Sequence, residues 1–228
     1  MKPQQTPPLP VRLWWRLVKF GFRLLYNEMA FTYDLVSQVV SLGEWRCWQR
    51  AALKHLDVPP GARVLEIAHG TGNLQLDLHD AGLRPIGLDL SRNMGRIARR
   101  KLRRRGLTPA LVRSRAQALP FPDSTFPAAL STFPTDFIVH PDTLSEVYRV
   151  LQPGGKLVFV PNGTLTGGGA ARQGLELAYR VTGQRGPWPP GVEERFAAAG
   201  FTLLAATELC KRSEATVLVA LNSAPPET

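Results

Sequence analysis

Short apolar runs alternate with segments of helical periodicity along most of this 228-residue chain. Apolar runs predict strands at Arg63–Ala68, Arg84–Leu90, Ala110–Ser114, Ala128–Thr132 and Lys156–Pro161. Helical spacing predicts helices between them at Leu74–Ala81, Ser91–Gly106 and Asp142–Leu151, and before the first strand at 11–28, 29–41 and 44–56. Strands that alternate with helices indicate a parallel sheet with helices on both faces.

The end of the chain departs from this alternation. Phe201–Leu209 and Ala215–Leu221 are strand-like runs joined by a short polar turn, so they predict a hairpin whose last strand is antiparallel to its neighbour. Glycine- and proline-rich loops flank a helix expected near Ala170–Val181. Trp188, in the second of these loops, is as well suited to anchoring the loop as to facing a substrate.

Length and composition indicate one globular domain, since 44% of the residues are hydrophobic and 20% are charged. We expect a disordered proline-rich start at 1–10, a helical cap or lid at 11–58 and an α/β domain at 59–222. Cys47 and Cys210 lie far apart and lack metal-ligand spacing, so we expect no metal site and a reducing, cytoplasmic setting.

The segment Val11–Tyr26 is apolar except for a narrow basic stripe. Arg12, Arg16, Lys19 and Arg23 stay within about 60° of one another on a helix. The segment is too short and too charged to span a bilayer, and no signal-peptide cleavage site follows it. Two interpretations stay open: a lid over the substrate, or a helix lying on an anionic membrane surface at the inner face of the membrane.

The net charge of +10 is unevenly distributed. Ten Lys or Arg residues and no acidic residue fall between Arg92 and Arg115, mostly on the helix predicted at Ser91–Gly106. No aromatic residues are interleaved with these arginines. We therefore favour a solvated helix face over a nucleic-acid surface.

The most informative motif is the glycine turn after the first strand. Gly70-Thr71-Gly72 separates an apolar strand from a helix, an arrangement that exposes backbone N–H groups to a ligand. Asp89 ends the next strand, seventeen residues after Gly72, where a carboxylate can accept hydrogen bonds from ribose hydroxyls. This pair predicts a nucleoside-containing cofactor.

Four motifs in order extend this interpretation. They are Leu65–Asn73, the Gly87–Met94 segment, Ala116–Phe126, and Glu146–Leu157 with its Arg149-Val150-Leu151-Gln152-Pro153-Gly154-Gly155 core. In these residues the chain resembles the class I S-adenosylmethionine-dependent methyltransferases, and most of all the small-molecule group that includes the quinone-biosynthesis C-methyltransferases. Tyr33–Arg46 also resembles the helical lead-in of that group. The resemblance covers roughly residues 30–220.

The resemblance implies a three-layer Rossmann-like methyltransferase fold, with a mostly parallel seven-stranded sheet, an antiparallel last strand and an N-terminal helical cap. It implies S-adenosylmethionine as cofactor and a small, hydrophobic methyl acceptor. The cofactor-binding residues would come from the carboxyl ends of the strands. They are Glu66, Ala68, His69, Gly70 and Gly72 around the methionine part, Asp89 at the ribose, Leu90, Ser91, Met94, Ala116 and Gln117 around the adenine, and Thr132 and Phe133 toward the sulfonium.

Three positions depart from the family pattern. His69 stands where a small residue is usual, Arg115 replaces an aspartate that binds the adenine amino group, and Pro127 replaces another aspartate. An arginine cannot accept a hydrogen bond, so the change at Arg115 removes a bond of about 1 kcal/mol, which stacking of the guanidinium could partly offset.

Methyl transfer requires mainly that the methyl donor and the acceptor atom lie close together and in line. A base is required only when the acceptor must lose a proton. The candidates for such a base are Asp136, His140 and Tyr33, none of which belongs to a recognisable catalytic pair. Two further hypotheses are a non-catalytic binding module with this fold and an RNA methyltransferase attracted by the basic helix.

Overall fold

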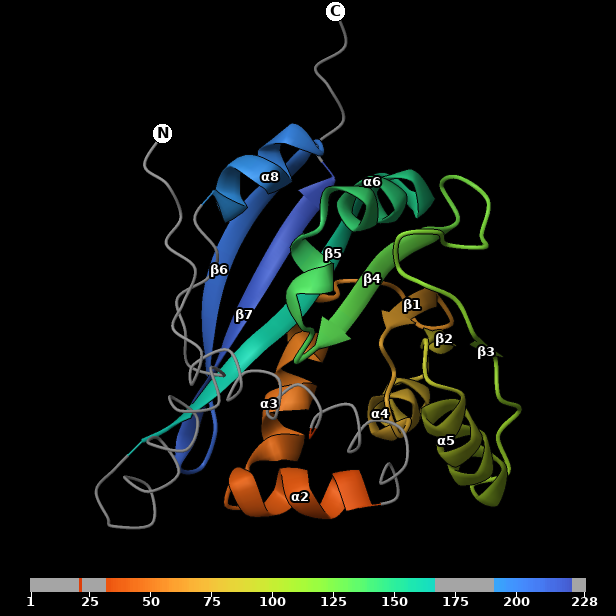
Figure 1. The fold of residues 1–228 in the computed structure, drawn as a ribbon, viewed down its shortest axis with the longest axis vertical. Helices are drawn as coiled ribbons and strands as arrows, with labels where there is room; N and C mark the ends of the chain where they lie inside the picture. The colour runs from red at the N-terminus through yellow and green to blue at the C-terminus, as the bar shows by residue number, and fades with distance from the viewer. Residues whose placement is uncertain (1–20, 22–31, 167–190, 223–228) are drawn as a thin grey trace, which may run out of the picture.

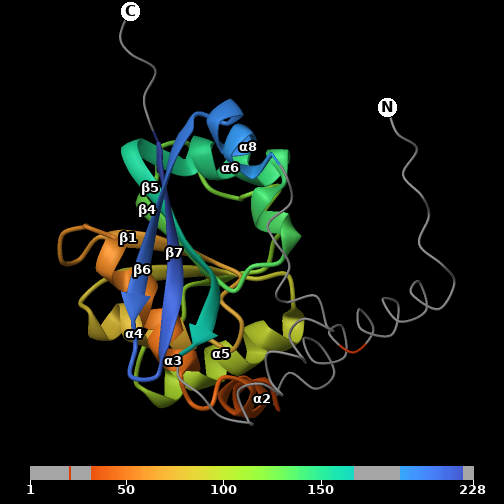
Figure 2. The same ribbon diagram turned by 90° about the vertical axis from the view of Figure 1, so that its left-hand side faces the viewer.

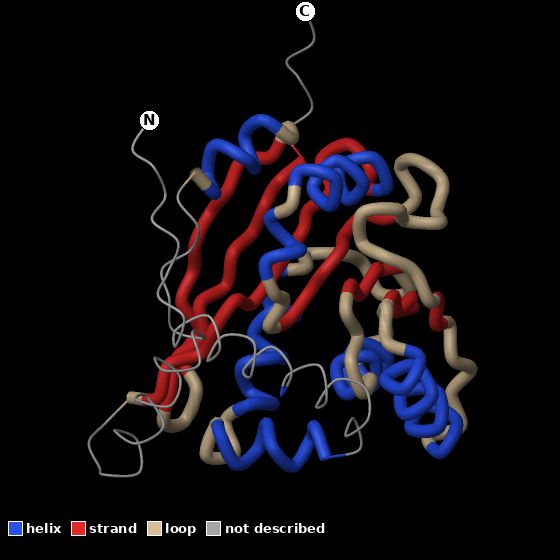
Figure 3. Tube along the Cα trace, in the orientation of Figure 1, coloured by secondary structure: helices blue, strands red, loops and turns tan. Residues whose placement is uncertain are grey.

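The structure, a computed structural model, describes residues 21, 32–166 and 191–222 (Figure 1). Seven strands form one sheet in the order β3-β2-β1-β4-β5-β7-β6, which runs through the whole described fold (Figure 3). The strands are β1 (Arg63–Ile67), β2 (Arg84–Leu88), β3 (Leu111–Val112), β4 (Phe126–Thr132), β5 (Leu151–Leu165), β6 (Phe201–Leu209) and β7 (Ser213–Asn222).

The sheet confirms the predicted topology. Strands β3, β2, β1, β4 and β5 are paired in parallel, and β7 is antiparallel to both β5 and β6. The antiparallel strand is inserted between its neighbours, so that β6 forms the edge of the sheet. Strand β5 is longer than the sequence predicts because it continues past Pro161, after a register shift, to pair Leu165 with Ser213.

The predicted helices that fall on described residues are present within a few residues. They are α2 (Tyr33–Val40), α3 (Trp45–Ala51) with the 3₁₀ turn η2 (Ala52–His55), α4 (Asn73–Asp80), α5 (Arg92–Arg104) and α6 (Pro141–Val150). The 3₁₀ turn η3 (Asp136–Val139) and helix α8 (Val192–Ala198) were not predicted. The helices predicted at 11–28 and Ala170–Val181 lie outside the described residues, apart from residue 21.

Helices cover both faces of the sheet, so the three-layer prediction is confirmed (Figure 2). One core cluster joins α6 and α8 to the face of β1 that carries Leu65 and Ile67. The other joins α3, η2 and α4 to the face that carries Val64. This alternation follows from the period of two along a strand.

Helix α3 is part of the second core. Trp48 exposes 1% of its surface and donates a hydrogen bond from Nε1 to Ser213 Oγ at 2.8 Å. Its ring lies directly against Gly163 of β5, where any side chain would overlap it. Helix α3 is thereby fixed to the β5–β7 region. The division of the chain at residue 59 stays a prediction.

The expectation that the two cysteines stay apart and reduced is wrong. Cys47 of α3 and Cys210, just after β6, form a disulfide with a Cα–Cα distance of 6.1 Å. The packing of α3 against the β6–β7 hairpin brings them together, which a sequence separation of 163 residues does not reveal. The two cysteines therefore no longer support the expectation of a reducing setting.

Among the described residues, one group of potential metal ligands gathers its atoms within 4.8 Å: Glu44, Cys47 and Cys210. Both sulfur atoms of that group already belong to the disulfide. Within the same part of the chain, the structure contains no helix with the length and apolar character that a membrane span requires.

Candidate functional site

The turn between β1 and α4 lies at the carboxyl end of the parallel strands. Its backbone is left-handed at Ala68, Gly70 and Gly72, with φ of 61°, 53° and 79°. A Cβ on Gly72 would lie 2.8 Å from Cβ of Ala98, so helix α5 can approach this closely only because the residue is glycine. A Cβ on Gly70 would meet nothing within 4 Å, which leaves open space beside this part of the turn.

Asp89 lies against this turn, as the sequence predicts for a ribose-binding carboxylate. Its Oδ2 accepts a hydrogen bond from the Gly70 N–H at 2.9 Å, and its Oδ1 accepts one from the Ser91 N–H at 2.7 Å. The carboxylate is half-buried. Each ionised oxygen can accept a further bond, so the group is oriented by the backbone and still able to receive two hydroxyls.

The residues after Asp89 form the start of α5. Ser91 caps this helix by accepting a hydrogen bond from the Met94 N–H at 3.3 Å. Leu90 exposes 60% of its surface and offers an apolar face beside the carboxylate. Met94 exposes 1%, which favours its role in packing over contact with an adenine ring.

Two ionisable side chains are buried beneath the turn. Glu66 of β1 exposes 2% of its surface and accepts a hydrogen bond from Gln75 Nε2 at 2.6 Å. Burial, reinforced by the carboxylates of Asp89 and Asp77, raises the pKa of Glu66 to about 8, so this carboxyl is mostly protonated at neutral pH.

His69 is also buried, and burial lowers the pKa of its imidazole. The neutral ring donates from Nδ1 to the Gly70 carbonyl at 2.8 Å. Its Cδ2 would lie 2.9 Å from a Cβ on Gly87, so the bare backbone of β2 makes room for the ring. His69 thus stabilises the glycine turn from below, where the family pattern has a small residue.

Asp34 of α2 is a site residue that the sequence analysis does not identify, although its segment resembles the family's helical lead-in. Its Oδ1 accepts hydrogen bonds from Thr71 Oγ1 at 2.6 Å and Asn73 Nδ2 at 2.9 Å, on either side of Gly72. Its Oδ2 pairs with Lys101 Nζ of α5 at 2.8 Å. Burial alone would raise the pKa of Asp34, but the bonds from Lys101, Thr71 and Asn73 outweigh it, and the pKa is lowered.

A carboxylate among apolar residues in the lead-in segment is the signal that could have identified this contact. Asp34 fixes α2 to the glycine turn and to α5 at once. A second ion-pair cluster, in which Arg46 and Arg50 of α3 bind the buried Asp77 of α4, fixes the next helix in the same way.

An aromatic cluster follows the end of β4. Phe133 has a left-handed backbone, with φ of 52°, and its ring stacks on Trp45 of α3 with centroids 3.9 Å apart. Tyr33 of α2 meets the edge of Trp45 at 6.2 Å. The predicted residues Phe133 and Tyr33 are therefore brought together through Trp45, which the sequence did not single out. Trp45 Nε1 is buried and has no hydrogen-bond partner in the described part of the chain.

The remaining predicted residues lie around this edge with differing exposure. Thr132 ends β4 and is half-buried. In the turn after β3, Ala116 is buried and Gln117 is half-buried, and the preceding Arg115 is exposed. Asp136 and His140 are exposed. His140 caps α6 by accepting at Nδ1 from the Asp142 N–H at 3.2 Å, so it has a structural role there.

Comparison with known proteins places these features in a family. The model of the ubiE/COQ5 methyltransferase family matches residues 21–169. The chain is 37% identical over 169 residues to the demethylmenaquinone methyltransferase of Thermus thermophilus, covering 71% of this chain and 72% of the relative. It is 36% identical over 168 residues to that of Symbiobacterium thermophilum, covering 69% and 63%.

The match to the ubiquinone/menaquinone biosynthesis C-methyltransferase UbiE of Shewanella halifaxensis is 33% identical over 141 residues, covering 59% of this chain and 56% of the relative. The chain thus spans about half to three quarters of the length of the curated relatives it matches.

Solved structures share the fold. The YcgJ protein from Bacillus subtilis superposes with a TM-score of 0.59 at 15% identity, covering 78% of this chain and 99% of that one. Geranyl diphosphate C-methyltransferase from Streptomyces coelicolor superposes with a TM-score of 0.59 at 14% identity, covering 77% and 78%.

Proposed function

Because the chain belongs to the ubiE/COQ5 methyltransferase family, we propose that it transfers a methyl group from S-adenosylmethionine to a small hydrophobic acceptor of the quinone type. The names of the relatives, which include demethylmenaquinone methyltransferases and a C-methyltransferase of quinone biosynthesis, support this acceptor class and a ring carbon as the methylated atom. Family membership favours this function over a non-catalytic binding module or an RNA methyltransferase.

The observation that carries the cofactor assignment is the carboxylate of Asp89 held against the glycine turn by the Gly70 N–H. In the proposal, Asp89 binds the two ribose hydroxyls and the open side of the turn at Gly70 receives the methionine part. Exposed Leu90 packs on the adenine, and the polar groups of Ser91 and Gln117 lie at its edge. When bound, S-adenosylmethionine supplies an electrophilic methyl group on a sulfonium.

On the acceptor side, the rings of Tyr33, Trp45 and Phe133 would form an apolar wall next to Thr132. The buried Trp45 N–H, without a partner in the described residues, would donate to a carbonyl or phenolate oxygen of the acceptor. The stacked rings would exclude water and hold a flat acceptor ring in line, which supplies the alignment that methyl transfer requires.

A ring carbon must release a proton after methylation, so the proposal includes a base. Tyr33, which reaches the aromatic cluster, fits this role by position. Asp136 and His140 remain candidates that a loop movement would have to bring to the acceptor, because both are exposed and His140 caps α6.

The membrane contact predicted for Val11–Tyr26, and its lid alternative, concern a segment that lies outside the described residues apart from residue 21. Both stay predictions, as does the cytoplasmic setting.

The test is a transfer assay with methyl-deuterated S-adenosylmethionine and a naphthoquinol that lacks the ring methyl. Mass spectrometry should detect a deuterated methyl group on the ring, and Trp45→Phe should raise KM for the quinol more than for the cofactor. Cofactor binding without any methylated product from this acceptor class would refute the proposed acceptor, and an unchanged KM would refute the role of the Trp45 N–H.

A further inference from the structure

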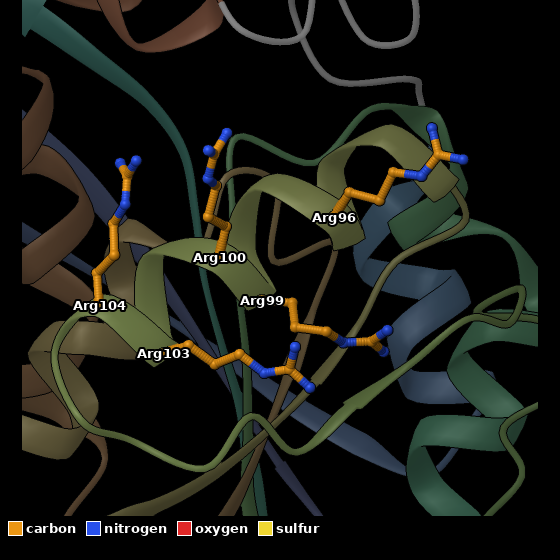
Figure 4. A pocket seen from close by; sticks show the side chains of 5 residues that line it. All are labelled: Arg96, Arg99, Arg100, Arg103 and Arg104. Atoms are coloured by element: carbon orange, nitrogen blue, oxygen red, sulfur yellow. The ribbon is translucent and has the colours of Figure 1, made fainter.

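The outer face of α5 is covered with arginine. Arg96, Arg99, Arg100, Arg103 and Arg104 are all exposed and line an open hollow of about 440 Å³. Figure 4 shows Arg96, Arg100 and Arg104 extending from one side of the helix and Arg99 and Arg103 from the other. At 100° per residue these five positions span an arc of about 140°. We call this set the arginine face.

Acidic residues of the protein do not neutralise the arginine face. In the described part of the chain, no ion pair involves any of its five members, and the one hydrogen bond among them joins Arg96 to Asn93 at 3.3 Å. Two other cations of this region are paired, Lys101 with Asp34 and Arg105 with Asp80. Like charges three and four residues apart destabilise a helix, so the unneutralised face favours an anionic partner.

The arginine side chains indicate which chemical groups a partner of this face would carry. Arginine binds phosphate through a planar fork of N–H donors, whereas lysine presents a single point charge. Every member of this face is arginine. A helix of 13 residues that bears five exposed guanidinium groups on one side matches a layer of phosphates better than it matches a single small anion.

The surroundings favour lipid over nucleic acid. The arginine face contains no aromatic side chain on which bases could stack. Helix α2, tied to α5 by the bond between Asp34 and Lys101, exposes Leu35 by 68% and Val39 by 61%. Cationic and apolar side chains on neighbouring helices are the combination that binds at a bilayer interface.

We propose that the arginine face of α5 docks the protein on an anionic phospholipid surface. The inference does not depend on the methyl acceptor, and it concerns residues separate from Val11–Tyr26. Docking of α5 would place the neighbouring glycine turn and the aromatic cluster close to a membrane.

The test is co-sedimentation of the 228-residue chain with vesicles of phosphatidylcholine alone and of an equimolar mixture with phosphatidylglycerol. The variant R96Q/R100Q/R104Q removes three charges from the face. The control R84Q/R195Q/K211Q removes three charges from exposed side chains elsewhere that make no ion pair in the described structure. Thermal unfolding of each variant establishes that it is folded, and relief of like-charge contacts should leave the first variant at least as stable as the original chain.

The original chain and the control should bind the mixed vesicles and not pure phosphatidylcholine, with binding that weakens as salt rises. The face variant should lose roughly 100-fold in partition coefficient, since each basic side chain near such a surface contributes about 1 kcal/mol. Equal binding by all three proteins, equal loss in the control, or tighter binding of RNA than of the mixed vesicles by the original chain would overturn the proposal.

Discussion

Replacing Glu66 by glutamine should remove a pH-dependent loss of folding stability that originates in the core. In the folded chain this carboxyl is buried under the glycine turn, and its pKa is raised from 4.5 to about 8. The folded chain therefore binds this proton more tightly than the unfolded chain does. Its contribution to stability is full below pH 4.5, falls as pH rises from 4.5 toward 8 and levels off above that window.

The size of the stability change follows from the pH interval between the two pKa values of Glu66, 4.5 and about 8. Each pH unit within it lowers the free energy of unfolding by about 1.4 kcal/mol, which gives about 3 kcal/mol by pH 7 and about 5 kcal/mol by pH 8. Glutamine keeps an oxygen that can accept the bond from Gln75 Nε2, and it cannot ionise. The variant should thus match the original chain near pH 4.5 and exceed it increasingly at higher pH.

Urea unfolding of both proteins between about pH 5 and pH 9 measures this difference. Glu193→Gln, which removes an exposed carboxylate from α8, serves as the control for net charge and should show no such trend. A difference between Glu66→Gln and the original chain that stays constant with pH would show that Glu66 ionises normally in the fold, and the argument from burial would fail.

Three further perturbations test other parts of the fold. Asp34→Ala should lose about 1 kcal/mol of stability, since its side chain is 40% exposed, and should weaken cofactor binding by loosening the turn; calorimetry and urea unfolding measure both effects, and unchanged binding would contradict the link to the turn. Gly72→Ala should cost about 2 kcal/mol or more, because the φ of 79° and the 2.8 Å approach to Ala98 both resist a side chain, and an unchanged thermal midpoint would rule out that close contact. Cys47→Ser should lower the free energy of unfolding by about 5 kcal/mol, the loop-closure value for a disulfide that spans 163 residues; if the original chain shows two free thiols under non-reducing conditions, the pairing is wrong.

The sequence predicted the elements with strong local signals. Strand positions, helix α5 and the hairpin follow from periodicity and breakers within each segment, and the pairing of Gly70 with Asp89 follows from the rule that parallel strands end at one edge. Helix α8, with seven residues directly after a glycine- and proline-rich segment, was missed.

Contacts between distant segments could not be predicted in the same way. The disulfide, the Asp34 contacts with Thr71 and Lys101, and the stacking of Trp45 on Phe133 each depend on how α2 and α3 pack on the finished sheet. Local pattern also could not show that Met94 is enclosed whereas Leu90 is exposed, because both are apolar residues near the same helix start.

The most direct test of the cofactor site is calorimetric titration of S-adenosylmethionine into the original chain, Asp89→Asn and the surface control Asp80→Asn. The amide in place of the Asp89 carboxylate should weaken two hydroxyl bonds and raise the dissociation constant on the order of 100-fold, about 3 kcal/mol, while Asp80→Asn should bind like the original chain. Equal affinity in Asp89→Asn, or no binding of the cofactor by the original chain, would contradict a nucleoside site between the glycine turn and Asp89.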